Sequence, residues 1–167
     1  MNSEILFSET QKFNQWWLWL ILLSSSSILI VVIIIIVGRQ DLIDKSIRNI
    51  IVILAGLLVI LPALLFVNLR LETQIRQDGV YVRFFPFHLS FKQYKWDKIS
   101  KSFVRKYSPI GEYGGWGFRF GASGDALNVS GDKGLQLEFS DKKKLLIGTN
   151  KPDELTKTLQ QIGQVKQ

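Results

Sequence analysis

The chain of 167 residues contains no cysteine and a single histidine, His88. The lack of cysteine excludes disulfide bonds and thiolate chemistry. The same counts exclude metal sites built from clusters of histidine and cysteine. Acidic residues are also in the minority, because 21 Lys and Arg oppose 14 Asp and Glu and give a formal net charge of +7.

Charged residues are absent from two apolar runs near the N-terminus, residues 16–37 and 50–69. At 1.5 Å per residue, helices of these lengths reach about 33 Å and about 30 Å, enough to cross a hydrocarbon core. The first run begins with Trp16, Trp17 and Trp19, and indole rings are stabilised at the membrane interface. This run is too long for the apolar part of a signal peptide. The sequence therefore predicts a transmembrane helical hairpin over residues 16–69, preceded by an N-terminal tail over residues 1–15.

Four consecutive serines, residues 24–27, interrupt the first apolar run. Their hydroxyls can bond to carbonyls of the preceding helical turn. One interpretation is a polar patch for a partner or a substrate path. The other is close packing of small residues against Ala55 and Gly56 in the second run, and we favour packing.

The connection between the two runs, residues 38–49, is short and predicts antiparallel helices with both chain termini on one side of the membrane. Basic residues flank the hairpin on both sides, with Lys12, Arg70, Arg76 and Arg83 on the terminal side and Arg39, Lys45 and Arg48 in the connection. Positive charge gathers on the cytoplasmic side of membranes. The margin of one residue favours cytoplasmic termini.

Residues 70–167 are patterned differently. Four basic and four acidic residues precede Arg70, so the whole net charge of +7 belongs to this region. Alternating apolar and polar residues, punctuated by turn signals such as Gln77-Asp78-Gly79, predict short strands. The expected strands cover residues 69–76, 80–85, 89–91, 99–107, 118–120, 126–129, 135–139 and 145–148, with an irregular glycine-rich loop at 111–117.

The last segment has a helical period, because Leu155, Leu159 and Ile162 fall on one face after Pro152. We expect a soluble, mainly-β domain over residues 70–167, a small barrel of about seven strands capped by this C-terminal helix. Its expected core comprises Leu71, Val80, Val82, Trp96, Ile99, Leu135, Leu137, Leu146, Leu155 and Leu159.

A glycine- and tryptophan-containing string marks the middle of this domain, and other segments accompany it. They are Tyr107-Ser-Pro-Ile-Gly-Glu-Tyr-Gly-Gly-Trp-Gly-Phe-Arg119, Ala126-Leu-Asn-Val-Ser-Gly131, Lys133-Gly-Leu-Gln-Leu137 and Leu146-Ile-Gly-Thr-Asn-Lys-Pro-Asp-Glu-Leu155. Over nearly all of residues 12–162 the chain resembles an uncharacterised bacterial family of two-helix membrane proteins with a pleckstrin-homology-like (bacterial PH) domain. The resemblance implies a PH-like fold of seven strands and a C-terminal helix, in the bacterial inner (cytoplasmic) membrane, without enzymatic activity or a cofactor. It supplies no binding residues.

The candidate recognition loop consists of Tyr113, Gly114, Gly115, Trp116 and Gly117. Backbone amides of glycine-rich loops can hold a phosphate, but neither of the common phosphate-loop patterns is present. Exposed aromatic residues on such a loop often form contact surfaces. Alternatively, the glycines permit turns with positive φ while the two aromatic rings fold back into the core.

Basic residues are dense between residues 92 and 106. The candidate membrane-surface contacts are Lys92, Lys95, Lys98, Lys101, Arg105 and Lys106. Each basic residue near an anionic membrane surface contributes about 1 kcal/mol. The alternative is a solvated strand face. A second basic run, residues 142–144, is most simply a hairpin tip.

Catalytic signals are weak. His88 and Ser90 lie two positions apart and Asp97 and Asp125 are isolated, but no nucleophile or carboxylate-pair motif surrounds them. We therefore expect no catalytic residues, no metal and no cofactor, and a protein that is not an enzyme.

Three functions remain open at this point. The first is a noncatalytic membrane-anchored module that recognises a protein partner or phospholipid headgroups. The second is a structural subunit that assembles with itself or with a larger membrane complex. The third is an enzyme that acts on a lipid or envelope substrate. Besides the bilayer, the expected partners are anionic headgroups, a membrane protein or further copies of the chain, with no nucleic acid.

Overall fold

The structure is a computed structural model that describes residues 4–13, 16–38, 44–121 and 123–166. The chain forms two compact units. One unit is helical and spans Asn14–Asn68, and the other is β-rich and combines Met1–Phe13 with Leu69–Gln167. Each unit is described by itself below.

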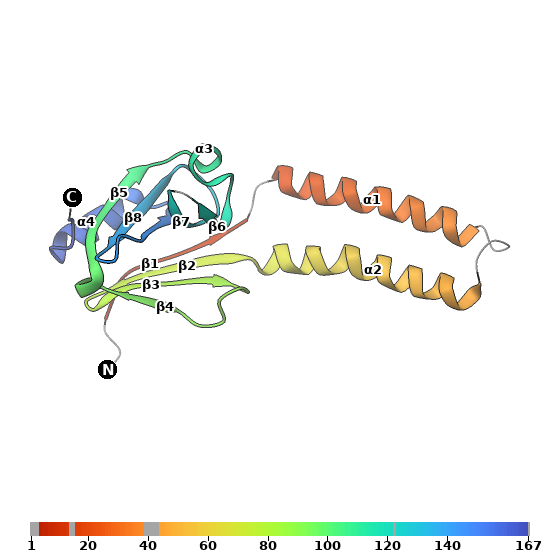
Figure 1. The fold of residues 1–167 in the computed structure, drawn as a ribbon, viewed down its shortest axis with the longest axis horizontal. Helices are drawn as coiled ribbons and strands as arrows, with labels where there is room; N and C mark the ends of the chain where they lie inside the picture. Colours follow the sequence, from red (N-terminus) through yellow and green to blue (C-terminus); the bar gives the residue numbers. More distant parts are fainter. Residues whose placement is uncertain (1–3, 14–15, 39–43, 122, 167) are drawn as a thin grey trace. The chain divides into compact units, whose positions relative to one another are not determined.

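The helical unit consists of α1 (Trp16–Gly38) and α2 (Lys45–Asn68), which run antiparallel beside each other (Figure 1). Both helices are long and apolar enough to cross a membrane, as the sequence predicts. Helix α2 begins five residues before the apolar run, because the Asp44 carboxylate accepts a hydrogen bond from the Ser46 N–H at 2.7 Å and caps the polar first turn.

The four serines of α1 bond within their own helix. Ser26 and Ser27 donate to the carbonyls four residues earlier, at 2.7 and 2.8 Å, and Ser24 and Ser25 to those three residues earlier, each at 3.0 Å. Back-bonding of this kind satisfies a hydroxyl without water. The serines are therefore compatible with an apolar surrounding.

The β-rich unit contains two sheets. Sheet A has the order β1-β2-β3-β4 and is antiparallel throughout, with β1 (Ile5–Lys12), β2 (Arg70–Arg76), β3 (Gly79–Phe85) and β4 (Lys92–Lys95). Sheet B has the order β5-β8-β9-β7-β6, with β5 (Ile99–Lys106), β6 (Gly117–Gly121), β7 (Gly124–Asn128), β8 (Lys133–Phe139) and β9 (Lys144–Gly148).

Two sheets replace the single small barrel that the sequence predicts. No closed barrel is formed within the described ranges, which hold nine strands rather than about seven. Strands β7 and β9 are parallel, whereas every other pair is antiparallel. Gly124 begins β7 with φ 103°, and a Cβ at this position would lie 2.6 Å from the Lys144 carbonyl oxygen. The parallel contact therefore requires glycine here.

Short helices complete the unit. The 3-10 turn η1 (Trp96–Lys98) joins the sheets, α3 (Pro109–Tyr113) follows β5, and α4 (Pro152–Gln161) is the expected C-terminal helix. Two local predictions shift. The strand expected at residues 89–91 forms at Lys92–Lys95, and the expected irregular loop at 111–117 contains the end of α3.

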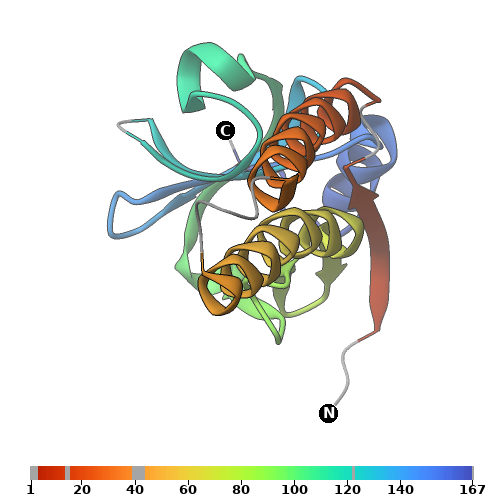
Figure 2. The same ribbon diagram turned by 90° about the vertical axis from the view of Figure 1, so that its right-hand side faces the viewer.

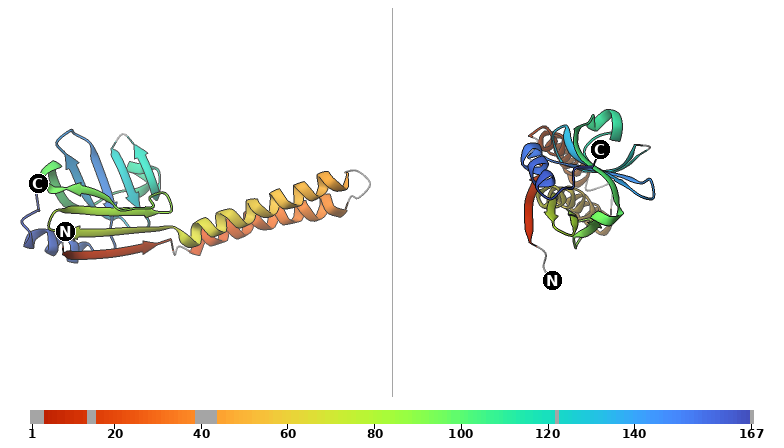
Figure 3. Two further views of the ribbon diagram at one scale, coloured as in Figure 1. Left: turned by 90° about the horizontal axis from the view of Figure 1, so that it is seen from below. Right: turned by 90° about the vertical axis from the view of Figure 1, so that its left-hand side faces the viewer.

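The N-terminal segment differs from the predicted tail. Residues Ile5–Lys12 form β1, which pairs with β2 from Lys12 opposite Arg70 to Ile5 opposite Arg76 (Figure 3). The strand before the helical hairpin thus lies beside the strand after it. Its inward positions are Phe7, Glu9 and Gln11. Because two of the three are polar, the segment lacks the alternation of apolar residues that identifies a half-buried strand.

Hydrogen bonds join the buried Glu9 and Gln11 side chains of β1 to the far end of the domain. Both carboxylate oxygens of Glu9, which is 7% exposed, accept hydrogen bonds, one from the Thr149 hydroxyl at 2.6 Å and one from the Asn150 N–H at 2.8 Å. The Gln11 amide donates to the Gly148 carbonyl at 2.7 Å. These bonds join β1 to the end of β9 and the start of α4, which lies beside β1 in Figure 2.

The core agrees with the sequence prediction. All ten residues expected in the core are buried. In β2 and β3, alternate residues such as Leu71, Ile75, Val80 and Val82 are fully buried. Alternation places these side chains on one face of sheet A. Helix α4 contributes Leu155 and Leu159, so the apolar stripe of this helix is the part that packs.

The β1–β2 pairing makes a prediction about membrane topology. If both helices cross the membrane, the two strands can pair only when both ends of the hairpin lie in one compartment. Reporter fusions at Met1 and at Gln167 should therefore give the same signal. Opposite signals would contradict a two-span hairpin.

A second prediction concerns the domain boundary. Antiparallel partners such as Lys12 and Arg70 lie about 5 Å apart, so a short Gly-Ser linker can replace residues 14–68. The linked fragment should unfold cooperatively and show a β-rich far-UV circular dichroism spectrum. Residues 69–167 alone should have a lower free energy of unfolding. They lack the pairing of Phe7 with Ile75 and the hydrogen bonds that Thr149 and Asn150 donate to the Glu9 carboxylate. Equal stability of the two fragments would show that β1 is dispensable.

Candidate functional site

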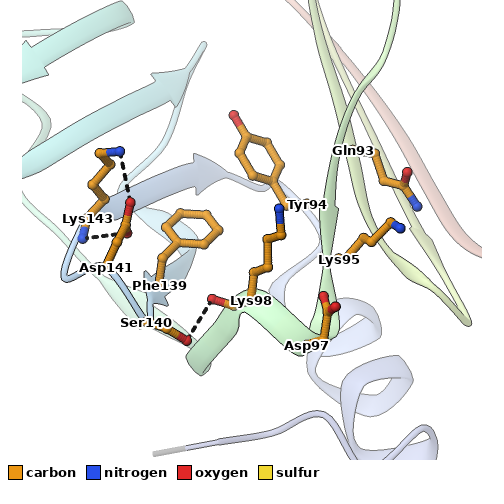
Figure 4. A pocket seen from close by; sticks show the side chains of 9 residues that line it. All are labelled: Gln93, Tyr94, Lys95, Asp97, Lys98, Phe139, Ser140, Asp141 and Lys143. Atoms are coloured by element: carbon orange, nitrogen blue, oxygen red, sulfur yellow. Dashed lines mark hydrogen bonds and ion pairs between the residues drawn. The ribbon is translucent and has the colours of Figure 1, made fainter.

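An open cleft of about 640 Å³ lies within the β-rich unit between the end of sheet A and a turn of sheet B (Figure 4). Its lining comes from β4, from η1 and from the β8–β9 turn. These residues are Gln93, Tyr94, Lys95, Asp97, Lys98, Phe139, Ser140, Asp141 and Lys143. The centroids of the Tyr94 and Phe139 rings are 5.4 Å apart, and the two rings form an aromatic floor.

Hydrogen bonds to the backbone fix the two walls of the cleft. The Trp96 indole N–H donates to the Arg76 carbonyl at 3.1 Å, which ties η1 to the end of β2. The Ser140 N–H and hydroxyl both donate to the Lys98 carbonyl, at 3.0 and 3.3 Å. The cleft is therefore held by the folded domain itself.

The rim of the cleft carries both signs of charge. The Lys143 ammonium lies 2.8 Å from the Asp141 carboxylate, and this hydrogen bond lowers the pKa of Asp141 and raises the pKa of Lys143. Within the described part of the chain, neither Lys95 nor Lys98 forms an ion pair. Their ammonium groups can therefore pair with an anionic group of a ligand.

Tyr94 keeps its proton at neutral pH. Burial and the negative charge of Asp125 raise the pKa of its phenol above the ordinary value. The ring thus offers an apolar face and a neutral hydroxyl rather than a charge.

The six basic residues proposed as membrane-surface contacts do not share one location. Lys95 and Lys98 line the cleft, whereas Lys92 lies at the other end of β4, opposite Val82. Lys101 is exposed on β5. The other two are engaged in ion pairs within the domain.

Lys106 and Arg105 form ion pairs within the domain. The Lys106 ammonium lies 3.2 Å from the Asp132 carboxylate, and Arg105 pairs with Glu112. The Arg105 guanidinium donates to both Glu112 oxygens, at 3.2 and 2.7 Å, and to the Gln136 amide oxygen at 3.0 Å. Glu112 also accepts from the Ser108 N–H at 2.8 Å. The bond to Arg105 lowers the pKa of Glu112 and raises that of Arg105. This pair ties α3 to β5.

The structure places a third lysine, Lys143, in the lining of the cleft with Lys95 and Lys98. This residue belongs to the basic run at residues 142–144, which the sequence presents as a separate hairpin tip. Only the strand connections bring it near Lys98, so no local sequence signal predicts the combination. The aromatic partners Tyr94 and Phe139 are also 45 positions apart in the chain.

The candidate recognition loop is largely part of the fold. Tyr113 is buried in a cluster with Tyr107, Ala126 and Leu146. Gly114 ends α3 with φ 70°, and Gly115 continues with φ 127°. The alternative in which Tyr113 folds into the core is therefore the one that the packing supports.

Two further residues of that loop are tied to neighbouring strands. The half-buried Trp116 donates its indole N–H to the Gly131 carbonyl at 3.2 Å, and the Gly117 N–H donates to the Asn128 side chain at 2.8 Å. The loop thus has little freedom to rearrange around a ligand.

The imidazole ring of His88 is held by contacts within the fold. Its Nδ1 accepts a hydrogen bond from the Phe84 N–H at 3.3 Å, and its ring packs against Phe118 with centroids 5.4 Å apart. Burial and the charge of Lys92 lower the pKa of His88. Asp97, one of the two isolated acidic residues noted in the sequence, lies on the rim of the cleft. The described residues contain no group of three or more potential metal ligands.

Comparisons with protein families, with curated proteins and with solved structures found no match. The chain has two candidate membrane helices and a β-rich unit with two sheets and a C-terminal helix.

The Arg105–Glu112 pair predicts a dependence of stability on pH. The pKa of Glu112 in the folded protein lies below its ordinary value of 4.5, so the carboxylate stabilises the fold above that pH. The contribution is lost as the pH falls through the lower, folded-state value. Thermal unfolding of the full chain in detergent should show that Glu112→Gln lowers Tm at neutral pH and that this difference shrinks below about pH 4.

Glu4→Gln is a matched control, because Glu4 is an exposed carboxylate just before β1. It should leave Tm nearly unchanged at both pH values. A Glu112→Gln difference that is the same at acidic and neutral pH would contradict an ionic contribution.

Proposed function

We propose that this protein is a noncatalytic, membrane-anchored recognition module whose PH-like domain binds a segment of a protein partner in the Tyr94–Phe139 cleft. In this proposal the helical hairpin holds the domain at the cytoplasmic face of a bacterial inner membrane. The two candidate spans, the two sheets with a C-terminal helix and the sequence resemblance support it. The single observation that carries the proposal is the cleft, with its aromatic floor and its rim of both charges.

The chemistry of the cleft favours a protein segment over a phospholipid headgroup. An anionic headgroup favours a site lined by cations, whereas Asp97 and Asp141 lie on the same rim as the lysines. An aromatic floor with a mixed polar rim is typical of protein interfaces, where Tyr and Phe are enriched. The expected ligand combines an apolar side chain for the floor with an acidic side chain for Lys95 or Lys98.

The position of the cleft in the domain supports the same choice. Strand pairing places Lys95 opposite Gly79, at the end of sheet A that contains the β2–β3 turn. The chain leaves the sheet toward α1 after Lys12 and returns from α2 before Arg70, at the opposite end. The cleft and the two chain connections to the hairpin therefore lie at opposite ends of sheet A.

Site-specific photocrosslinking tests this proposal in the full-length chain. A benzoylphenylalanine at Gln93, an exposed residue of the cleft, should give a discrete protein adduct in the native membrane. The same group at Lys157, exposed on α4, should not give that adduct. Lys98→Glu should abolish the adduct at Gln93, because it replaces the unpaired cation with an anion.

Lys101→Glu is the matched charge reversal, since Lys101 is exposed on β5 but does not line the cleft. It should leave the adduct intact. A chloroform-extractable lipid adduct would indicate a headgroup ligand instead. An adduct with the mass of two copies of the chain would indicate self-assembly, and equal loss with both reversals would indicate bulk charge. Each of these three results would overturn the proposal.

A further inference from the structure

Phe87, Leu89 and Phe120 are among the exposed large apolar side chains of the β-rich unit. Phe87 is 58% exposed and Leu89 is 79% exposed, and both lie in the connection between β3 and β4. Phe120, on β6, is 73% exposed. Isolated apolar residues on a surface are ordinary, but a contiguous group of them indicates a contact surface.

Ring contacts join His88, Phe118 and Phe120, and Phe87 and Leu89 are the chain neighbours of His88. Phe87 stacks on the buried Phe84 with centroids 5.9 Å apart. His88 packs against Phe118, and Phe118 lies 4.6 Å from Phe120. We call Phe87, His88, Leu89, Phe118 and Phe120 the aromatic patch. It spans the β3–β4 connection of sheet A and the edge strand of sheet B.

Strand register gives the position of the patch along the sheet. Phe85, the last residue of β3, pairs with Arg70, and Arg70 pairs with Lys12. Helix α2 ends at Asn68, so a single residue separates it from β2. The connection that carries Phe87 and Leu89 therefore starts at the end of sheet A where the chain leaves for α1 and returns from α2.

We infer that the aromatic patch embeds in the interfacial layer of the bilayer that the hairpin crosses. Amphipathic and aromatic side chains are stable at this depth, as in the aromatic belts of membrane proteins. Trp16 and Trp17, at the start of α1, are 71% and 38% exposed. Their indole rings are also stable in the interfacial layer. A lipid interface covers the patch without requiring a second protein.

Charge around the patch fits an anionic interface. Lys92 is exposed three residues after Leu89, and Lys12 is exposed at the same end of sheet A. A lowered pKa keeps His88 neutral at neutral pH, which removes the cost of placing a charge among the apolar rings. Basic residues beside an apolar patch are the usual composition of surfaces that lie on membranes.

This inference is separate from the proposed function. It concerns the end of sheet A opposite to the cleft and a lipid surface rather than a protein ligand. An embedded patch would fix the domain against the membrane and leave the cleft accessible to its partner.

The lack of cysteine allows a direct test in the full chain. A single cysteine at Ser90, exposed beside the patch, is labelled with the environment-sensitive fluorophore NBD, so that the patch itself stays intact. The chain is reconstituted into vesicles of phosphatidylcholine and phosphatidylglycerol, with and without doxyl-labelled lipid. The emission should shift to shorter wavelength and lose more than half its intensity with the doxyl lipid.

The matched control is the same label at Ser140, an exposed serine beside the cleft, which should show neither effect. Quenching at Ser90 should persist in 1 M salt, because apolar insertion is not screened. Replacing Phe87 and Leu89 with serine should abolish the quenching, while cooperative thermal unfolding at an unchanged Tm shows that the domain is folded.

Three results would overturn the inference. The first is an emission at Ser90 that matches that at Ser140. The second is a shift to shorter wavelength without quenching by the doxyl lipid, which would show that a second copy of the chain covers the patch. The third is quenching that survives the two serine replacements, which would show proximity to lipid without insertion.

Discussion

The pairing of β1 with β2 is the constraint on which the rest of the structure depends. It closes the chain across the whole helical hairpin, from Lys12 to Arg70. An antiparallel helix pair brings its two ends together, so helix formation reduces the entropy cost of bringing the two strands into contact. In return, the paired strands require the two ends of the hairpin to lie close together.

The polar side chains of β1 extend this constraint to the far part of the domain. Glu9 uses both of its carboxylate oxygens on Thr149 and Asn150 at the start of α4. A buried carboxylate is costly unless it is fully hydrogen-bonded. Glu9 therefore fixes the position of β1, because only the segment with Thr149 and Asn150 supplies the donors that its carboxylate needs. An apolar side chain at this position would not require those donors.

The two ends of sheet A differ in chemistry. At one end, η1 and the β8–β9 turn enclose an aromatic floor with charges of both signs. At the other end, the chain connects to the helices and the β3–β4 connection exposes Phe87 and Leu89. A domain with separate surfaces at its two ends can be anchored and bind at the same time.

Sequence alone determined those features that depend on composition and on local period. Uncharged runs identify α1 and α2, alternation identifies β2, β3 and β8, a short apolar run identifies β9, and a helical period identifies α4. All ten predicted core residues are buried, and most of them lie where a strand or helical period places apolar side chains on one face. These signals act over a few residues, so no knowledge of distant contacts is required.

Tertiary structure decided what depends on distant partners. Strand β1 is stabilised by β2 and by α4, and its buried Glu9 and Gln11 conceal it in the sequence. The basic residues between 92 and 106 read as one cluster, yet the fold pairs Arg105 with Glu112 and brings Lys98 near Lys143 in the cleft. Local patterns report which side chains are buried. Only the order of strands in the two sheets determines which exposed side chains meet, because that order joins segments more than 40 residues apart.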